Sequence, residues 1–481
     1  MKRKFITNLS FFLLLNLLIK PVYVFGIDRV VQNKVGAEIY GRYFTLFNIA
    51  IIFQILLDLG IENFIRREIA KDPERSGVFF PNIIIFKVLL LIPYFIICFA
   101  IASIQGIDTR DFYFLALILL NQSLASFILY VRSNMGGLQL FKTESVVSVV
   151  DRSLMILVVG SLLIYPVTGH RFRIEWFVIS QTFAYLVSLI IGLFLLLRKI
   201  DSFRFQFQFA LLKPILQKLK PFALLVLLMA IYYRIDSIML SSLLPDGNQQ
   251  AGIFAHGFRI LDFMSNYALL FPVLLLPIFS RSLHQRQPVD GLLQLSALIL
   301  IVPSLVVISP AIIYRYNLFE ILYKEQIHLS ADVFAVLTIS FLGMCISYTF
   351  GALLTANGNL RQLNIMAAIA VALSISLNSI LIPKYHVFGA AITNASVQVF
   401  TIIFQVVLAV KIFKLRINKK LIFKIILFLI LLILVSYTVK CSHLPWLTAS
   451  AVIVLLGLIL SVGTGLISFR GLLSILKQEP S

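Results

Sequence analysis

Charged side chains in the middle of long apolar segments are the residues of this sequence that could do chemistry. Lys20 lies about twelve residues into an apolar run that begins near residue 8, which is about 18 Å along a helix. Asn16 precedes it by one helical turn. An ionised group at that depth in a membrane costs about 2.5–3.5 kcal/mol unless it meets a partner or a wet cavity. We therefore expect Lys20 to face the protein interior and bind an anion, with Asn16 as a secondary polar group.

A second apolar run, residues 41–65, carries Asp58, Glu62 and Arg66 at spacing i, i+4, i+8. On one continuous helix these side chains share a face, and Glu62 is placed to pair with Arg66. Such a stripe cannot face lipid, so we expect it to line the interior. For Glu62 and Arg66 a purely structural clip between helices is an equally good interpretation, and Arg66 is also near enough to the helix end to reach water.

Two later runs repeat this pattern of deep charges. Arg234 and Asp236 lie about midway through residues 221–244, and their spacing gives each a different direction on a helix. Residues 251–279 carry Arg259, Asp262 and Asn266 at i, i+3, i+7, which is again one face. We expect this face to line the same interior as the stripe of the second run.

Ammonium and guanidinium groups bind phosphate oxygens strongly, so the deep cations favour a phosphate-bearing ligand. The predicted ligand-binding cations are Lys20, Arg234 and Arg259. The predicted cavity carboxylates, which orient these cations or bind a coupling ion, are Asp58, Glu62, Asp236 and Asp262. The secondary polar residues are Asn16, Arg66, Asn266 and Asn378; for Asn378 we favour a helix-joining role over sugar binding. Charges nearer the span ends are interpreted as structural: Lys87, Arg132, Asp151 and Arg152.

The elements that must position these charges are transmembrane helices. The chain has 481 residues, is 60% hydrophobic and has a mean hydropathy of +0.98. Apolar runs of about 20 residues, each long enough to cross a bilayer, recur along it about fourteen times. The sequence therefore predicts an all-α membrane protein with about fourteen transmembrane helices. The basic start Met1 to Lys4 resembles a signal peptide, but Lys20 interrupts the run, so we expect it to remain as the first helix.

The net charge of +20 agrees with a membrane topology and not with nucleic-acid binding. With the N-terminus in the cytoplasm, about 25 of the 41 Lys and Arg residues fall on the cytoplasmic side, as the positive-inside rule requires. Both termini are then cytoplasmic. The three cysteines and six histidines lack metal-ligand spacing, so no metal site is expected. No phosphate loop or nucleophile elbow occurs, so neither a cofactor nor catalysis is expected.

A weak internal repeat divides the chain. Tyr40-Gly41-Arg42-Tyr43 opens the second span, and Ala251-Gly252-Ile253-Phe254 opens the eighth. Duplicated bundles are typical of transporters, because two similar halves can rock about a site between them. We predict a six-helix lobe over 1–197, a cytoplasmic interfacial linker over 198–220, a second six-helix lobe over 221–412, and two additional helices with a short tail over 413–481.

The segment from Leu377 to Tyr385, followed by Phe388 to Thr393, resembles the Asn-x-x-Leu-Ile-Pro signature of Wzx-like polysaccharide flippases. These belong to the multidrug/oligosaccharidyl-lipid/polysaccharide exporter superfamily. The stretch from Tyr233 to Leu240 is similar to the family's second-half opening, and the likeness extends over spans 1 to 12. His386 departs from the pattern, because the family often has glycine there.

The resemblance implies a flippase of the bacterial inner membrane that moves a polyprenyl-pyrophosphate-linked oligosaccharide by alternating access, for O-antigen, capsule or exopolysaccharide synthesis. Its partners would be that substrate, membrane lipids, a glycan polymerase and other assembly proteins. One alternative is an ion-coupled multidrug exporter of the same superfamily, although Lys20 stands where drug-extruding relatives commonly use carboxylates. The alternative from another class is a membrane-embedded glycan polymerase or acyltransferase, which the short outer loops disfavour.

Overall fold

The chain is helical because a bilayer offers no hydrogen-bond partner to an exposed backbone, and an α-helix satisfies its own peptide groups. A computed structural model describes residues 15–73, 76–164, 172–200, 209–415 and 418–466, and these contain helices but no strand. In these ranges twelve helices are long and apolar enough to span a membrane. Two further segments are helical: 15–35, which contains a π-helix over Val22–Asp28, and 247–284, which is divided at Leu269. This is the predicted all-α architecture of about fourteen spans.

Contacts group the chain into two compact units, residues 1–252 and 253–481. Helix α9 therefore belongs by its contacts to the first unit. The predicted lobes, which follow the sequence repeat, remain a prediction. Residues 201–208 of the predicted linker lie outside the described residues, and residues 209–220 form the first turns of α9.

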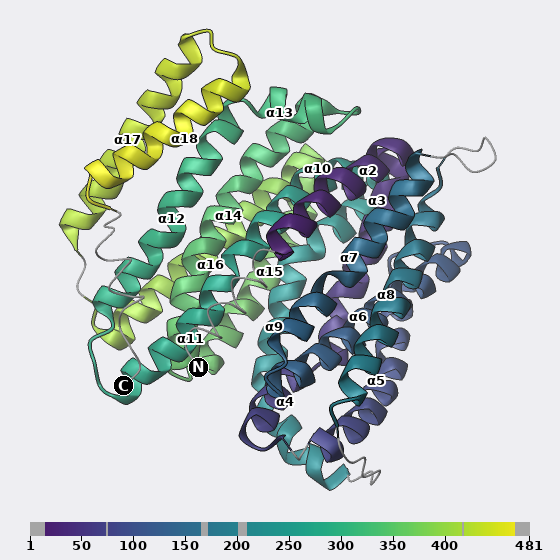
Figure 1. Cartoon of the computed structure of the whole chain (residues 1–481). Coiled ribbons are helices and arrows are strands. Elements are labelled where there is room, and N and C mark those ends of the chain that lie inside the picture. The colour runs from purple at the N-terminus through teal and green to yellow at the C-terminus, as the bar shows by residue number, and fades with distance from the viewer. Residues whose placement is uncertain (1–14, 74–75, 165–171, 201–208, 416–417, 467–481) are drawn as a thin grey trace. The chain divides into compact units, whose positions relative to one another are not determined.

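The first unit is a bundle of long helices (Figure 1). Within it α6 packs on α4 and α8, α7 packs on α8, and α3 packs on α9. Residues 15–21 are helical and continue into the rest of the unit, whose elements are η1 (Val22–Asp28, a π-helix), α2 (Arg29–Val35), α3 (Ala37–Phe53), η2 (Gln54–Leu57), α4 (Ile61–Lys71), α5 (Ser76–Ile104), η4 (Thr109–Asp111), α6 (Phe112–Gly137), α7 (Phe141–Ile164), α8 (Ile174–Leu197), α9 (Phe209–Leu243) and the first turns of α10 (Gly247–Ala268).

In the second unit α14 packs on α11, α12 and α16, α15 packs on α16, and the hairpin of α17 and α18 packs on α12. The hairpin is held by apolar contacts: Val306 of α12 lies with Phe428 and Leu432 of α17 in one buried cluster. The remaining elements are α11 (Leu270–His284), α12 (Asp290–Ile313), α13 (Arg315–Leu322), α14 (Ile327–Ala356), α15 (Leu360–Tyr385), α16 (Val387–Phe413), α17 (Lys419–Cys441) and α18 (Trp446–Gly463).

The second span is not the continuous helix that the sequence predicted. Helix α3 ends at Phe53, and α4 begins at Ile61 after the 3-10 turn η2. Between them Leu59 and Gly60 have φ of 49° and 84°, which an α-helix does not accommodate. The prediction of one helical stripe from Asp58 to Arg66 is therefore wrong, because Asp58 precedes α4.

The eighth span is also divided, close to a proline. Helix α10 ends at Ala268 and α11 begins at Leu270. Pro272 lacks the N–H that would bond to the carbonyl of Ala268, so the ladder stops there. Pro277 lies inside α11.

The turn between α15 and α16 explains why His386 is unusual. His386 has a φ of 53°, a conformation that glycine adopts without steric cost and other residues rarely adopt. The next glycine, Gly389, packs so closely on the backbone of Leu381 that a side chain there would meet that carbonyl oxygen.

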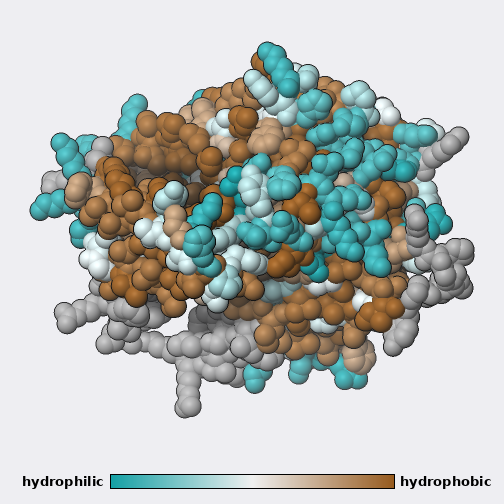
Figure 2. Space-filling view, turned by 90° about the horizontal axis from the view of Figure 1, so that it is seen from above, coloured by the Kyte–Doolittle hydropathy of each residue, from teal (hydrophilic) through white to brown (hydrophobic). Residues whose placement is uncertain are grey.

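Large apolar side chains are exposed on most of the long helices, for example Ile190, Val407 and Ile459. Hydrophobic residues cover broad areas of the face shown in Figure 2. In water such a surface would be unstable, whereas in a bilayer it is the expected exterior.

Candidate functional site

The first unit gathers most of the predicted deep charges, together with others that were predicted to be structural. They form two groups. One surrounds Lys20 and the other surrounds Glu62.

Lys20 lies in the first helix, directly before the π-helix η1, and is half-buried. The charged groups that act on it are Arg152 first, then Arg132, then Asp151. Among the described residues Lys20 makes no ion pair. Three cations, Lys20, Arg132 and Arg152, therefore lie near one another together with Asp151, and we call this group the cation cluster; Arg132 is also near Glu144. An excess of positive charge of this kind attracts an anion.

Arg152 is held rigidly by its neighbours. One guanidinium nitrogen donates to the Tyr185 hydroxyl at 2.9 Å and lies 3.4 Å from Asp151. The guanidinium carbon lies 4.8 Å from the centre of the Tyr23 ring, which is a cation–π geometry. The Nε of Arg132 is buried without a hydrogen-bond partner among the described residues. The cluster thus contains a donor that a bound anion could satisfy.

Asn16 belongs to the same region. It is buried and its amide donates to the hydroxyl of Ser148 on α7 at 3.3 Å. This bond joins the first helix to α7 beside the cation cluster. Asn16 therefore fixes the position of the helix that carries Lys20.

Arg132 and Arg152 were predicted to be structural and not to belong to this group. The signal was present for Arg152, which lies eleven residues into α7 and hence about 16 Å along it, near mid-span. What could not be read from the sequence was that α6 and α7 present their cations to the first helix. That depends on packing.

The second group is centred on Glu62 of α4. Its carboxylate lies 3.9 Å from the ammonium of Lys87 on α5, which is 1% exposed and donates to Ser126 at 2.8 Å. Arg66 pairs with Glu144 of α7 at 2.6 Å. The prediction that Glu62 pairs with Arg66 is therefore wrong, because each residue finds its partner on another helix.

Asp58 is used locally by the backbone. Its two carboxylate oxygens accept the N–H groups of Gly60 and Glu62, each at 3.0 Å. These N–H groups belong to the start of α4, where no intrahelical carbonyl is available. Asp58 thus holds α4 in place after the left-handed turn.

Arg234 and Asp236 lie on α9, which packs on α3. Arg234 is half-buried and donates to the amide oxygen of Asn48 at 2.9 Å, and Asn48 donates to the hydroxyl of Ser237 at 2.7 Å. Asp236 is fully buried. These contacts join the second and seventh spans inside the first unit.

The remaining predicted residues belong to the second unit. Arg259 is half-buried on α10, and Asn266 is exposed and donates to the backbone carbonyl of Asp262. Asn378 is fully buried on α15, and its amide lies 3.5 Å from the hydroxyl of Ser374 on the same helix. The structure therefore brings Lys20, Asn16, Asp58, Glu62, Arg66, Arg234 and Asp236 into one unit, and Arg259, Asp262, Asn266 and Asn378 into the other.

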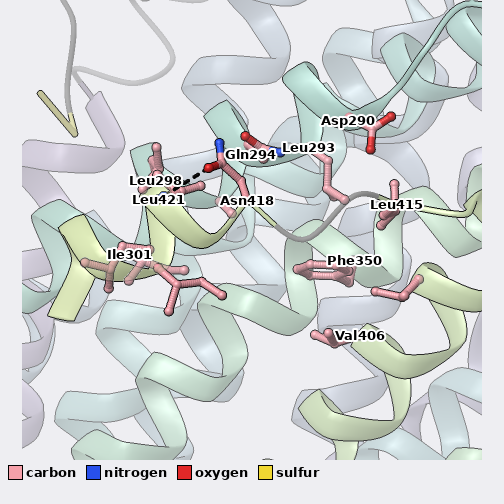
Figure 3. A pocket seen from close by; sticks show the side chains of 14 residues that line it. Asp290, Leu293, Gln294, Leu298, Ile301, Phe350, Val406, Leu415, Asn418 and Leu421 are labelled. Carbon is pink, nitrogen blue, oxygen red and sulfur yellow. Dashed lines mark hydrogen bonds between the residues drawn. The ribbon is translucent and has the colours of Figure 1, made fainter.

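A cavity of about 350 Å³ lies in the second unit, between α12, α14, α16 and α17. Figure 3 shows its apolar wall, formed by residues such as Leu298, Ile301 and Val406, and its few polar groups, Asp290, Gln294 and Asn418. The cation cluster and the group around Glu62 do not line this cavity. Its lining suits hydrocarbon and offers little to sugars or phosphate. In the described residues no group of His, Cys, Asp or Glu could hold a metal ion.

The family model described as "Polysaccharide biosynthesis protein" matches residues 7–283, which is more than half of the chain. The chain belongs to this family. The matched residues include the cation cluster, both interrupted spans and α9. No curated protein matches the sequence.

Comparison with solved structures shows that this chain has a known transporter fold. The lipid II flippase MurJ in an inward closed conformation is 15% identical, with a TM-score of 0.60 over 91% of this chain and 98% of its own. A transporter of the multidrug/oligosaccharidyl-lipid/polysaccharide (MOP) superfamily from Pyrococcus furiosus is 14% identical, with a TM-score of 0.59 over 84% and 96% of the two chains. An inward-facing multidrug resistance MATE transporter is 14% identical, with a TM-score of 0.57 over 85% and 98%.

At such identities the likeness establishes the fold of the MOP superfamily. The family match and this fold together confirm the resemblance to Wzx-like flippases of the MOP superfamily. The MATE structures share the fold equally, so the fold alone does not decide the substrate.

Proposed function

We propose that the protein is a flippase that moves a polyprenyl-pyrophosphate-linked oligosaccharide across the bacterial inner membrane by alternating access. The observation that carries this proposal is the cation cluster of the first unit. Lys20, Arg132 and Arg152 lie near one another, Asp151 pairs with Arg152, and Lys20 has no ion pair among the described residues. Positive charge in excess at membrane depth favours a ligand with phosphate charges over a cationic drug.

In this proposal the pyrophosphate and its sugars occupy the polar interior, and the polyprenyl tail stays in lipid. The cation cluster attracts the phosphates, and Arg234 and Arg259 add the positive charge predicted for the seventh and eighth spans. Asp236 and Asp262 orient these cations or bind a coupling ion. Both termini lie in the cytoplasm, and a glycan polymerase takes up the product.

The MATE-like alternative predicts a different preference. A cationic drug needs deep carboxylates that are free of cations, as opposite charges attract at low dielectric. In the first unit Glu62 and Glu144 are each paired with a cation, and Asp58 accepts two backbone N–H groups. These carboxylates are therefore poorly placed to bind a cationic drug.

Charge reversal at Lys20 tests the proposal. We expect Lys20→Glu to abolish surface glycan at normal membrane levels of the protein, and Lys20→Arg to retain most of it. Lys34→Glu is the matched control, because Lys34 is exposed on the following helical segment and undergoes the same change of charge. Normal surface glycan in the Lys20→Glu strain would reject the assignment of this residue.

Deletion of the gene tests the substrate class. We expect the lipid-linked oligosaccharide to accumulate on the cytoplasmic side, measured by extraction and mass spectrometry. A deletion strain with normal glycan and increased sensitivity to cationic drugs would instead establish the drug exporter.

A further inference from the structure

The interruption of the second span creates a groove on the first unit that the proposed transport does not use. A cavity of about 420 Å³ lies between η2 with its following turn and the first part of the seventh span. Three residues of the interrupted span, Ile55, Leu56 and Leu59, form one wall. The other wall is α9.

The wall formed by α9 is one face of that helix. Its residues are Lys220, Ala223, Leu224 and Leu227, at spacing i, i+3, i+4, i+7. Lys220 is exposed, and Leu224 is 45% exposed. The groove is thus open at its side and lined by hydrocarbon, with one ammonium group among its lining residues.

The place of Lys220 along α9 determines the depth of its ammonium group in the membrane. The seventh span predicted from the sequence begins at residue 221, so Lys220 lies at the membrane surface, on the predicted cytoplasmic side. Leu227 lies seven residues further along the helix, which is about 10 Å deeper. The groove therefore runs from the headgroup level into the hydrocarbon.

The sequence adjoining the groove is strongly basic. Residues 198–220 contain six Lys or Arg residues and one acid, Asp201. Basic groups at the cytoplasmic end of membrane helices attract anionic lipid headgroups. The basic end and the apolar length of the groove thus match the two parts of one anionic phospholipid.

We propose that this groove is a binding site for an anionic phospholipid of the inner leaflet, with the headgroup phosphate at Lys220 and one acyl chain between η2 and α9. The site holds the irregular backbone of the second span against α9 with hydrocarbon on its open side. Its occupant is a structural lipid, separate from the transported substrate, and the proposal does not depend on the identity of that substrate.

Native mass spectrometry of the full-length protein in detergent, titrated with phosphatidylglycerol or phosphatidylcholine, tests the site. We expect phosphatidylglycerol to bind about five-fold more tightly, the preference that one cation near the surface provides. Lys220→Gln should reduce that preference to near unity. Lys199→Gln is the matched control, because Lys199 is an exposed cation of the same basic segment outside the groove.

Filling the groove is the second arm. We expect Ala223→Phe to lower binding of both lipids, since its ring would occupy the apolar wall, while Val226→Phe at an exposed position of α9 outside the groove should not. Gel filtration shows that each variant is folded. The proposal is overturned if Lys199→Gln weakens binding as much as Lys220→Gln, or if Ala223→Phe binds lipid like the unchanged protein.

Other occupants have distinct outcomes. Binding of a polyprenyl phosphate that depends on Lys220, without binding of phosphatidylglycerol, would overturn the phospholipid assignment in favour of a substrate-like lipid. A species of twice the chain mass that disappears in Ala223→Phe would overturn it in favour of a second copy of the protein.

Discussion

The fully buried ammonium of Lys87 illustrates how single residues constrain this protein. It is 1% exposed, donates to Ser126 and lies 3.9 Å from Glu62. A buried charge that loses its partner is left desolvated and uncompensated. Loss of one partner should therefore change the free energy of unfolding more than the net attraction between the two charges would suggest.

Lys87→Met should lower the free energy of unfolding by about 3–5 kcal/mol, because Glu62 then lacks its cation. Unfolding in mixed micelles measures this change. Combining Lys87→Met with Glu62→Gln should recover at least half of the loss, since no charge is then left unpaired. A double variant as unstable as Lys87→Met would show that the pair is not coupled.

Asp58 provides a second prediction at the residue scale. Because its oxygens accept two backbone N–H groups at the start of α4, Asp58→Ala should lower the free energy of unfolding by about 1 kcal/mol. Asp58→Asn retains an acceptor and should keep most of the surface glycan. Loss of glycan in a stable Asp58→Asn protein would mean that the negative charge itself is needed, as a coupling-ion site requires.

At the scale of elements, the crossing of α3 with the start of α10 depends on the two glycines of the sequence repeat. A side chain at Gly41 would meet the carbonyl oxygen of Asn248, and one at Gly252 would meet the carbonyl oxygen of Ala37. Both obstacles are backbone atoms, which cannot rotate away. The two helices therefore approach closely only because both positions are glycine.

Gly41→Ala and Gly252→Ala should each lower the free energy of unfolding by about 1–3 kcal/mol through overpacking. Gly463→Ala in α18 is the control, because nothing lies within 4 Å of a side chain there. That change should be neutral or slightly stabilising. Stability measured in mixed micelles distinguishes the two classes, and an unchanged Gly41→Ala protein would contradict the close crossing.

At the scale of the whole molecule, the chain comprises two units of packed helices whose exteriors are apolar. Its free cysteines report on the topology, because Cys98 and Cys345 are buried while Cys441 is exposed at the end of α17. In the predicted topology this end lies on the outer side of the membrane.

A membrane-impermeant maleimide added from the outer side should therefore label the protein at one position. Labelling should disappear in Cys441→Ser and stay in Cys98→Ser, which is the matched control. Labelling of Cys441 only in inverted membrane vesicles would reverse the predicted topology.

The sequence by itself determined the helical membrane class, the number of spans and the presence of deep charges. An apolar run of bilayer length forms a helix, because in lipid the backbone must satisfy its own hydrogen bonds. Pro272 marks the break of the eighth span, because it lacks an N–H. The family resemblance was stated from the segment around Asn378, whereas the family model matches residues 7–283 and does not reach that segment.

Only the tertiary structure decided which charges meet. Glu62 and Arg66 are one turn apart in the sequence, yet Glu62 pairs with Lys87 and Arg66 with Glu144. The break at Leu59 and Gly60 and the grouping of Lys20 with Arg132 and Arg152 were equally hidden. The physical reason is that partners on different helices are set by how the helices pack, whereas helix periodicity fixes only neighbours on the same helix.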